Sequence, residues 1–556
     1  MKPARRKSST VHIGKIAIGG DNPIRIQSMT NTSTMDTQAS ISQCMSIINA
    51  GGELVRLTAQ GVKEAQNLQN IRAELRKINY ETPIIADIHF NINAAITAAK
   101  AVDKVRINPG NFVDAHLNIG KPDFSEIEYQ QGINKIRSKL IPFLNVCKEH
   151  NTAVRIGVNH GSLSDRIMSK YGDTVDGMVE SCMEYLRICI EEDFREVVVS
   201  MKASSVRVMV ESVRLLVRKM DEEGMEFPIH LGVTEASDGE DGRIKSAVGI
   251  GVLLYEGIGD TIRVSLSEAP ENEIPVAKAL INYIHGNNTK DAQQINLPQN
   301  AETRKVPIVI ADYSNAKHYQ GNTEIPPDII YRGSNYLLNI PQEIKELDMF
   351  EIIYPQDINP DTFNRLKQFP KIKVILSAEN FHEQKIAFLQ LKNKQIPNQI
   401  IIHRKYSEPD ADTFRLKAAA DCGYFFLQGL ADGIFLQNTA GNISPETVYL
   451  CSFGILQAAE ARITKTEYIA CPGCGRTLFD LQNTLKQVKE ATKHLKGLKI
   501  GVMGCIVNGP GEMAGADYGY VGAGSGKISL YKGKECIKKN IPEADAIKEL
   551  LKVIQK

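Results

Sequence analysis

Short apolar runs and longer amphipathic segments alternate eight times in the first 290 residues, and this alternation constrains the fold more than any other feature. The runs are rich in β-branched residues, and segments between them, such as 124–150, carry apolar residues at helical spacing. Eight such units predict a parallel (β/α)8 TIM barrel, whereas a doubly wound sheet would usually show fewer units and a glycine-rich first turn. The runs span residues 24–30, 54–59, 83–89, 104–110, 153–159, 196–204, 228–236 and 261–268.

Most of these predicted strands begin apolar and end polar. Pairs such as Asp87/His89 and Ser200/Lys202 are separated by an even number of positions, so both members of a pair face the same side of a strand. If that side is the barrel interior, five cations converge on one mouth of the barrel. We call these five residues the cationic cup: Arg56, Arg106, Arg155, Lys202 and Arg263.

The cationic cup predicts a ligand with several negative charges. Like charges repel in a low-dielectric site, and each buried, unpaired ion costs several kcal/mol. Asp87 and Glu235 alone cannot neutralise five cations, and arginine forks suit phosphate oxygens. In the alternative interpretation, some of these arginines point outward and pair with helix carboxylates. A small phosphorylated substrate is the better explanation for the whole set.

Residues 291–445 continue the α/β pattern without a comparable set of cations at the strand ends. The polar stretch 287–305 is expected to be a linker, and we expect His403 and Arg404 to form an exposed pair on a loop. The segment is interpreted as a structural or interaction domain. Its predicted strands span residues 307–313, 371–379, 399–405 and 433–437.

The C-terminal part carries a cysteine pattern with three interpretations. Cys471-Pro-Gly-Cys474 lies between a predicted strand and a helix, and Cys505 follows a second strand, in front of a Gly/Pro-rich turn that ends at Glu512. A thioredoxin-like disulfide oxidoreductase would use the CxxC pair but leaves Cys505 unexplained. A zinc ribbon needs four ligands, usually two close pairs, and Cys536 is far from Cys505. An iron–sulfur cluster with three thiolates, and one iron left for Glu512 or a substrate, explains the pattern better.

Composition narrows the class of protein. Lys+Arg 66 against Asp+Glu 65 gives a net charge of +1, which argues against a general nucleic-acid-binding protein. No apolar run approaches the ~18 residues that a spanning helix needs, and no signal peptide is visible at the N-terminus. We therefore expect a cytoplasmic protein whose partners include neither nucleic acid nor a membrane. In a reducing compartment, clustered cysteines favour a metal or redox site over disulfides.

Seven stretches closely resemble one enzyme family, and CPGCGRT followed by GCIVNGPGE is a highly specific combination. The family is that of the 4-hydroxy-3-methylbut-2-enyl diphosphate synthases of the methylerythritol phosphate route to isoprenoids, in the three-domain form with an inserted middle domain. The stretches are IRIQSMTNTSTMDT, KVRINPGN, VRIGVNHGSL, GVTEA, IRVSLS, EYIACPGCGRTLFD and GCIVNGPGE.

The resemblance implies three domains. Residues 1–290 would form the substrate-binding TIM barrel, and residues 291–445 an inserted α/β domain with a structural role. Residues 446–556 would form an α+β domain that carries a [4Fe–4S] cluster and resembles domains of nitrite and sulfite reductases.

The resemblance also implies a reaction and its residues. The enzyme would be an oxidoreductase that opens the ring of 2-C-methyl-D-erythritol 2,4-cyclodiphosphate with two electrons from ferredoxin or flavodoxin, releasing water and (E)-4-hydroxy-3-methylbut-2-enyl diphosphate. Glu235 would be the proton donor near the leaving hydroxyl. The implied cluster ligands are Cys471, Cys474, Cys505 and Glu512. The implied substrate-binding residues are Arg56, Asp87, His89, Arg106, Arg155, Asn159, Lys202, Arg263 and Ser265.

The barrel mouth and the cysteines lie in different domains, so the cluster domain is expected to close over the mouth as a lid that excludes water. The sequence leaves open whether the lid belongs to the same chain or to the neighbour in a homodimer, as is thought for two-domain relatives. We hypothesise that the inserted domain repositions the C-terminal part and so allows closure within one chain.

Overall fold

The computed structural model describes residues 5–113, 124–287, 306–314, 324–333, 335–340, 343–347, 350–477, 479–506, 509–513 and 515–555. The chain forms two compact units. The barrel unit contains Arg6–Gly242, Ile258–Lys278 and Lys465–Lys556. The middle unit contains Met1–Arg5, Arg243–Gly257 and Ala279–Thr464. The predicted linker 287–305 lies, apart from its first residue, outside the described residues.

Eight parallel strands form the predicted TIM barrel. They pair in the order β8-β7-β6-β5-β4-β3-β10-β9, and a parallel bridge between Val199 of β8 and Ile229, just before β9, joins the two ends. The prediction of a (β/α)8 barrel is therefore confirmed. The strands are β3 (Arg25–Met29), β4 (Leu54–Thr58), β5 (Ile84–Asp87), β6 (Lys104–Ile107), β7 (Ala153–Asn159), β8 (Val197–Lys202), β9 (His230–Leu231) and β10 (Thr261–Ile262).

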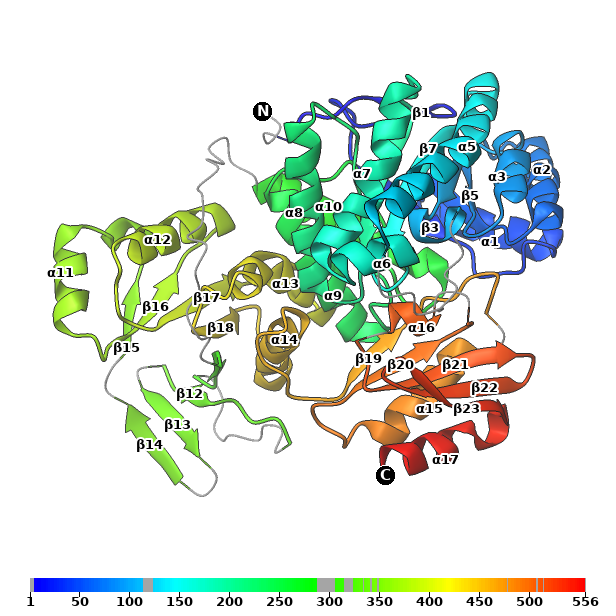
Figure 1. Cartoon of the computed structure of the whole chain (residues 1–556). Coiled ribbons are helices and arrows are strands. Elements are labelled where there is room, and N and C mark those ends of the chain that lie inside the picture. Colours follow the sequence, from blue (N-terminus) through cyan, green and yellow to red (C-terminus); the bar gives the residue numbers. More distant parts are fainter. Residues whose placement is uncertain are drawn as a thin grey trace. The chain divides into compact units, whose positions relative to one another are not determined.

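Helices alternate with these strands and surround them, as Figure 1 shows for α1, α2, α3 and α5. Several begin at a capping side chain: Asp36 accepts from the Ala39 amide and Ser205 from the Val208 amide. The helices are α1 (Thr37–Asn49), α2 (Val62–Lys77), α3 (Ile92–Ala99), α4 (Pro109–Phe112), α5 (Glu126–His150), α6 (Asp165–Tyr171), α7 (Val175–Glu191), α8 (Val206–Glu222) and the 3-10 turn η1 (Pro270–Asn272). Two further helices, α9 (Gly239–Tyr255) and α10 (Glu273–Asn287), belong in part to each unit.

A hairpin closes the amino-terminal end of the barrel. Strands β1 (Val11–Ile13) and β2 (Ile16–Ile18) pair antiparallel and share one apolar core with residues near the starts of the barrel strands, such as Leu54 and Ala153. Burial of these aliphatic side chains stabilises that end. The polar carboxyl ends of the strands are left for the opposite mouth, where TIM barrels bind their substrates.

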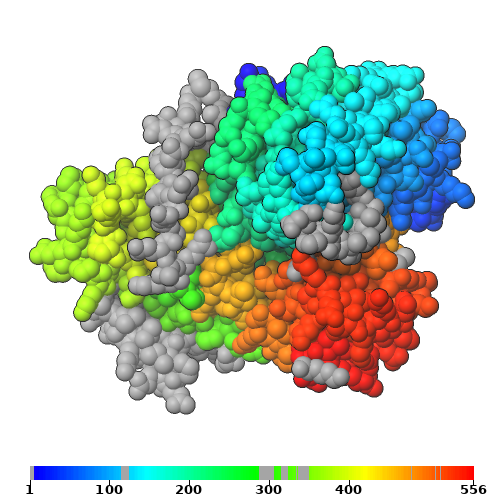
Figure 2. Space-filling view, viewed as in Figure 1, coloured from blue at the N-terminus to red at the C-terminus, as the bar shows by residue number. Residues whose placement is uncertain are grey.

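The C-terminal residues of the barrel unit form a mixed five-stranded sheet in the order β19-β20-β21-β22-β23. Helices α15 and α17 contact each other and pack on the same side of the sheet (Figure 1). Residues 465–556, orange to red, form one continuous body in Figure 2. The elements are β19 (Glu467–Ala470), α15 (Leu481–Thr492), β20 (Lys499–Met503), α16 (Gly509–Glu512), β21 (Tyr518–Gly524), β22 (Lys527–Lys532), β23 (Glu535–Pro542) and α17 (Glu543–Ile554).

The middle unit contains a second eight-stranded sheet in the order β14-β13-β12-β11-β18-β17-β16-β15. Strand β13 runs antiparallel to both of its neighbours, β12 and β14, and the other strand pairs given for the sheet are parallel. The four strands predicted here correspond to β11, β16, β17 and β18; the other four were not predicted. The elements are β11 (Ile308–Asp312), β12 (Ile329–Tyr331), β13 (Tyr336–Ile340), β14 (Glu343–Leu347), β15 (Phe350–Ile353), η2 (Pro355–Asp357), α11 (Pro360–Gln368), β16 (Lys373–Ser377), α12 (Phe381–Asn393), β17 (Ile400–Tyr406), α13 (Ala411–Leu427), β18 (Gly433–Asn438) and α14 (Pro445–Ala458).

The expectation of an exposed His403/Arg404 pair is wrong. Both residues lie on β17 and are buried. Arg404 Nη2 donates to Asp421 Oδ2 at 2.6 Å, and the same carboxylate accepts hydrogen bonds from the hydroxyls of Tyr255 and Tyr283. The arginine therefore neutralises a buried carboxylate inside the middle unit, which is a structural role.

The predicted boundary at residue 445 coincides with the start of α14. This helix packs on α13, β11 and β18, so it belongs to the middle unit up to Thr464. The division into three domains stays a prediction, with its last boundary better placed near residue 464. None of the described helices combines the length and apolar character that a membrane crossing requires.

Candidate active site

One pocket in the barrel unit lies where the carboxyl ends of the barrel strands meet the loops of the C-terminal sheet. It encloses about 710 Å³, part of which is open to solvent. The structure brings every site residue predicted from the sequence to this pocket. They are Arg56, Asp87, His89, Arg106, Arg155, Asn159, Lys202, Glu235, Arg263, Ser265, Cys471, Cys474, Cys505 and Glu512.

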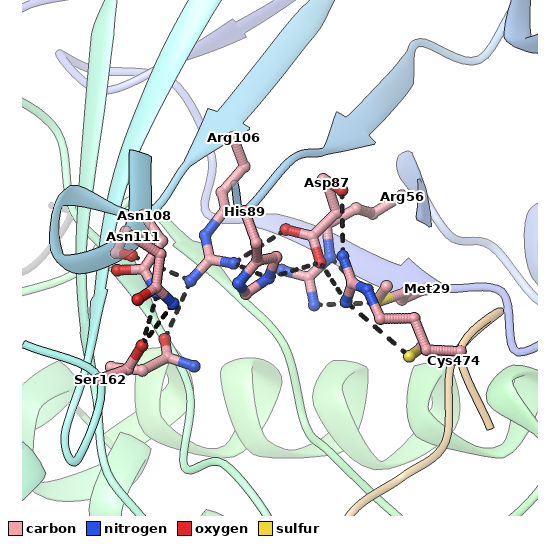
Figure 3. A network of polar contacts seen from close by, with 12 residues as sticks. Met29, Arg56, Asp87, His89, Arg106, Asn108, Asn111, Ser162 and Cys474 are labelled. Carbon is pink, nitrogen blue, oxygen red and sulfur yellow. Dashed lines mark hydrogen bonds and ion pairs between the residues drawn. The ribbon is translucent and has the colours of Figure 1, made fainter. Parts of the chain in front are cut away.

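Arg106 is the centre of a polar network at the ends of β5, β6 and β7 (Figure 3). Its guanidinium donates to Asp87 Oδ1 at 3.0 Å and to Asn159 Oδ1 at 3.0 Å, and it also contacts His89 Nε2. Burial alone would raise the pKa of Asp87, but Arg56 and Arg106 hold it well below its usual value. Burial, together with the Arg106 charge, lowers the pKa of His89 to about 3. At neutral pH the network therefore holds a charged Asp87 and a neutral His89.

Arg263 is already paired, which corrects the expectation that only Asp87 and Glu235 are available to neutralise the cationic cup. Its Nε and Nη2 atoms donate to the two oxygens of Glu273, at 2.9 and 2.8 Å. Both side chains are buried. Glu273 also accepts from Ser28 Oγ at 2.7 Å, so its carboxylate is well satisfied. This partner could not be recognised from the sequence, because a glutamate in the first turn of a helix is usually a solvated residue.

Three cations of the cup form no ion pair with any residue that the structure describes: Arg56, Arg155 and Lys202. Burial, with the neighbouring arginines, lowers the pKa of Lys202 and of Arg155 well below their usual values. Burial chiefly lowers the pKa of Arg56 to about 10, so this residue stays charged at neutral pH. A ligand with two or more negative charges would relieve the repulsion among these groups.

Glu235 faces this pocket in a strained conformation. Its φ of 49° is in the left-handed region, which is sparsely populated for non-glycine residues. The next residue, Ala236, forms a parallel bridge with Ala470, the residue before Cys471, and this bridge holds the loop in place. Burial, and then the neighbouring Glu512 carboxylate, raise the pKa of Glu235 well above its usual value. The side chain can therefore hold a proton at neutral pH.

The C-terminal loops contact the barrel mouth of their own chain. Asn159 Nδ2 donates to Glu512 Oε1 at 2.5 Å, and Ser267 Oγ donates to the Cys471 carbonyl at 2.9 Å. The backbones of Gly161 and Gly511 approach so closely that a Cβ on Gly511 would lie 2.1 Å from the Gly161 oxygen. The sequence could not decide which chain supplies the lid, and these contacts describe closure within one chain.

The donor set fits a cluster better than a single metal ion. Among the described residues, no three His, Cys, Asp or Glu side chains are close enough together to hold one ion. Cys471, Cys474, Cys505 and Glu512 nevertheless line one pocket, none of the three cysteines forms a disulfide, and the Gly504 amide donates to Cys471 Sγ at 3.3 Å. Soft thiolates spread around a cavity, with amide donors to sulfur, suit an iron–sulfur cluster.

Two of the pocket residues that sequence reasoning missed make polar contacts there. Met29 Sδ lies 2.9 Å from Arg56 Nη2, and Arg476 reaches the pocket from the C-terminal part. A methionine at a strand end gives no chemical signal. Arg476, two residues after Cys474, could have been noticed as a cation next to the cysteine pair.

Comparisons with known proteins agree with this architecture. Residues 8–278 match the family model described as the GcpE TIM-barrel domain, and residues 467–556 match the GcpE protein C-terminal domain. The two matches coincide with the barrel and with the sheet that carries the cysteine loops.

Curated relatives match the chain over nearly its whole length. Proteins from Phocaeicola vulgatus, Bacteroides thetaiotaomicron and Parabacteroides distasonis are 51%, 50% and 50% identical to it, and each match covers 99% of this chain and 98% of the relative. All three are named 4-hydroxy-3-methylbut-2-en-1-yl diphosphate synthase (flavodoxin).

Proposed function

The chain belongs to the GcpE family of 4-hydroxy-3-methylbut-2-en-1-yl diphosphate synthases, and we propose that its cationic cup and its cysteine loops form the single site of that reaction. The enzyme is an oxidoreductase of isoprenoid precursor synthesis. It opens the ring of 2-C-methyl-D-erythritol 2,4-cyclodiphosphate and releases water and (E)-4-hydroxy-3-methylbut-2-enyl diphosphate. The observation that carries the proposal is one pocket lined by both the cations and the three thiols.

The cup binds the diphosphate. Arg56, Arg155 and Lys202 lack carboxylate partners among the described residues, so their charges are available for phosphate oxygens. Arg106 and Arg263 are fixed by Asp87 and Glu273 and present further N–H groups in rigid positions. Asn159 and Ser265 add neutral polar groups to the wall of the pocket.

Cys471, Cys474 and Cys505 would hold three irons of a [4Fe–4S] cluster, and Glu512 would hold the fourth. When bound, the cluster supplies the two electrons of the ring opening, one at a time. Glu512 is the hard, exchangeable ligand of the set, since a carboxylate binds iron less softly than a thiolate does. Asn159 fixes the Glu512 carboxylate in the pocket through its side-chain amide.

Glu235 is the proposed proton donor. Its carboxyl is buried, faces the same pocket and is kept protonated by burial and by Glu512. It delivers its proton to the substrate oxygen that leaves as water. The loop contacts between Gly161 and Gly511 help to exclude bulk water while this happens.

Flavodoxin or ferredoxin is the proposed electron donor, since the relatives are named for flavodoxin. None of the ten cysteines forms a disulfide, which suits a reducing compartment and supports a cytoplasmic location. A homodimer stays a prediction.

Anaerobic purification tests the cluster and the reaction together. We expect a brown protein with about four irons and four sulfides per chain that turns over the cyclodiphosphate with reduced flavodoxin. Cys505→Ser should lose both colour and activity. Cys536→Ser is the matched control, because Cys536 is a partly exposed thiol of the same sheet that does not line the pocket. A colourless, zinc-containing and active protein would refute the proposal, and activity that survives Cys505→Ser would favour a CPGC disulfide oxidoreductase.

A further inference from the structure

Arg476 is a buried cation that reaches the substrate pocket from the cysteine loop. It lies two residues after Cys474, its side chain is only 6% exposed, and it lines the pocket together with the cationic cup. Six cations line this pocket in the described part of the chain. Five lie on barrel strands or directly after one, and Arg476 lies on the loop that follows β19.

Its guanidinium contacts both halves of the site. Arg476 Nη2 donates to the backbone oxygen of Asp87 at 3.4 Å, and Nη1 lies 3.8 Å from Asp87 Oδ2. The same Nη1 lies 4.0 Å from Cys474 Sγ, at the long end of the range for a hydrogen bond to sulfur. Figure 3 shows Cys474 on the same side of the network as Asp87 and Arg56. Arg476 Nη1 thus lies between the carboxylate of Asp87 and the thiol of Cys474, a proposed cluster ligand.

Groups of opposite charge alternate around Arg476. The carboxylate of Asp87 also accepts from Arg106, so Cys474, Arg476, Asp87 and Arg106 form an alternating row of negative and positive groups once the thiol is a thiolate. A fixed positive charge beside a thiolate stabilises the more negative, reduced state of a cluster.

We propose that Arg476 is a positioning residue that couples substrate binding in the cationic cup to the reduction potential of the cluster. The inference rests on the proposed function, because it requires Cys474 to be a cluster ligand. A diphosphate in the cup competes with Asp87 and Cys474 for the Arg476 charge. Coupling is reciprocal: if substrate changes the ease of reduction, reduction changes the affinity for substrate by the same factor.

The test uses the anaerobic holoenzyme with Arg476→Gln and Arg476→Lys, and with Arg187→Gln as the matched control. Arg187 pairs with Glu180 and Glu223 on the barrel helices, away from the pocket. Iron and sulfide content, the midpoint potential with and without the cyclodiphosphate, and the substrate Kd of the oxidised enzyme are measured for each protein. None of these readouts depends on turnover.

For Arg476→Gln we expect a full cluster, at least tenfold weaker substrate binding and a more negative midpoint potential. A tenfold loss in the stability of the reduced form corresponds to about 59 mV for one electron. The shift in potential that substrate causes should shrink, and Arg476→Lys, which keeps the charge, should restore at least part of each effect. The control should match the wild type.

Two results would overturn the inference. A fully loaded Arg476→Gln enzyme with wild-type potential and wild-type Kd would show that the charge has no coupling role. Loss of iron from either variant would show that Arg476 supports the loop that holds the cluster and does not couple it to substrate binding. If the wild-type protein binds no iron, the proposed function itself fails.

Discussion

Gly511 is the position at which closure of the site can be tested with a single methyl group. A Cβ on Gly511 would lie 2.1 Å from the carbonyl oxygen of Gly161 and 2.9 Å from its carbonyl carbon. Both contacts are to backbone, which cannot rotate away as a side chain could. Gly161 has a φ of +74°, so alanine there would add backbone strain, whereas Gly511 lies outside the left-handed region. Gly511→Ala therefore isolates the steric effect.

The expected loss follows from the displacement that the methyl group demands. Two such atoms need at least 3.0 Å, so α16 and the Gly161 loop must separate by about 0.9 Å. A misplacement of about 1 Å at a catalytic centre costs on the order of 10²-fold in rate. Glu512 follows Gly511 directly, so its carboxylate moves with the backbone. The three cysteines lie on other turns, and we expect the iron content to stay at the wild-type level.

The assay compares turnover with reduced flavodoxin, iron content and substrate Kd for Gly511→Ala and for Gly515→Ala. Gly515 is the matched control, because a Cβ there meets no atom within 4 Å. We expect kcat to fall about 10²-fold in Gly511→Ala and to stay at the wild-type value in Gly515→Ala. Wild-type turnover in Gly511→Ala would refute the idea that the Gly161–Gly511 contact belongs to the working enzyme.

Three further predictions follow from the site. Glu235→Gln should lower kcat by about 10²- to 10⁴-fold while substrate still binds; an unchanged kcat would exclude Glu235 as the proton donor. Glu273→Gln leaves Arg263 buried without its counter-charge and should reduce the free energy of unfolding by about 3–5 kcal/mol, measured by urea denaturation. An unchanged urea midpoint would show that the Arg263–Glu273 pair does not stabilise the fold. Mixing Lys202→Ala chains with Cys505→Ser chains should restore no activity, because each site closes within one chain; rescue would instead mean that the lid comes from a partner.

The barrel and its polar mouth could be predicted because the relevant signals are local. Each barrel strand lies within one of the predicted runs. The even spacing of Asp87/His89 and of Ser200/Lys202 predicted that the members of each pair share a face, and Asp87, His89 and Lys202 do line the pocket. The spacing of Cys471, Cys474 and Cys505 likewise predicted the C-terminal part of the site. In each case residues close in sequence determine which side of an element a group occupies.

What the sequence did not reveal depends on contacts between side chains of different elements. The pairing of Glu273 with Arg263 needs the first turn of α10 to lie next to the end of β10, and the position of Arg476 beside Asp87 needs closure of the C-terminal loops. The four unpredicted strands of the middle unit, β12 to β15, are short or lie at one edge of the sheet, where apolar patterning is weak. His403 and Arg404 were misjudged because their partners lie on other elements: His403 contacts Gln437 of β18, and Arg404 pairs with Asp421 of α13.

Closure also accounts for features that would destabilise the barrel by itself. Glu235 holds a φ of 49°, three buried cations lack carboxylate partners among the described residues, and Gly161 holds a φ of 74°. Each feature is satisfied from outside the barrel: Ala470 bridges the residue after Glu235, Gly511 covers Gly161, and a diphosphate would neutralise the cations. Strain of this kind collects at sites where a second component completes the structure. The barrel mouth is therefore half of a site. Its cations without carboxylate partners specify a negatively charged ligand, and the loops of Glu235 and Gly161 fit the C-terminal loops that cover them.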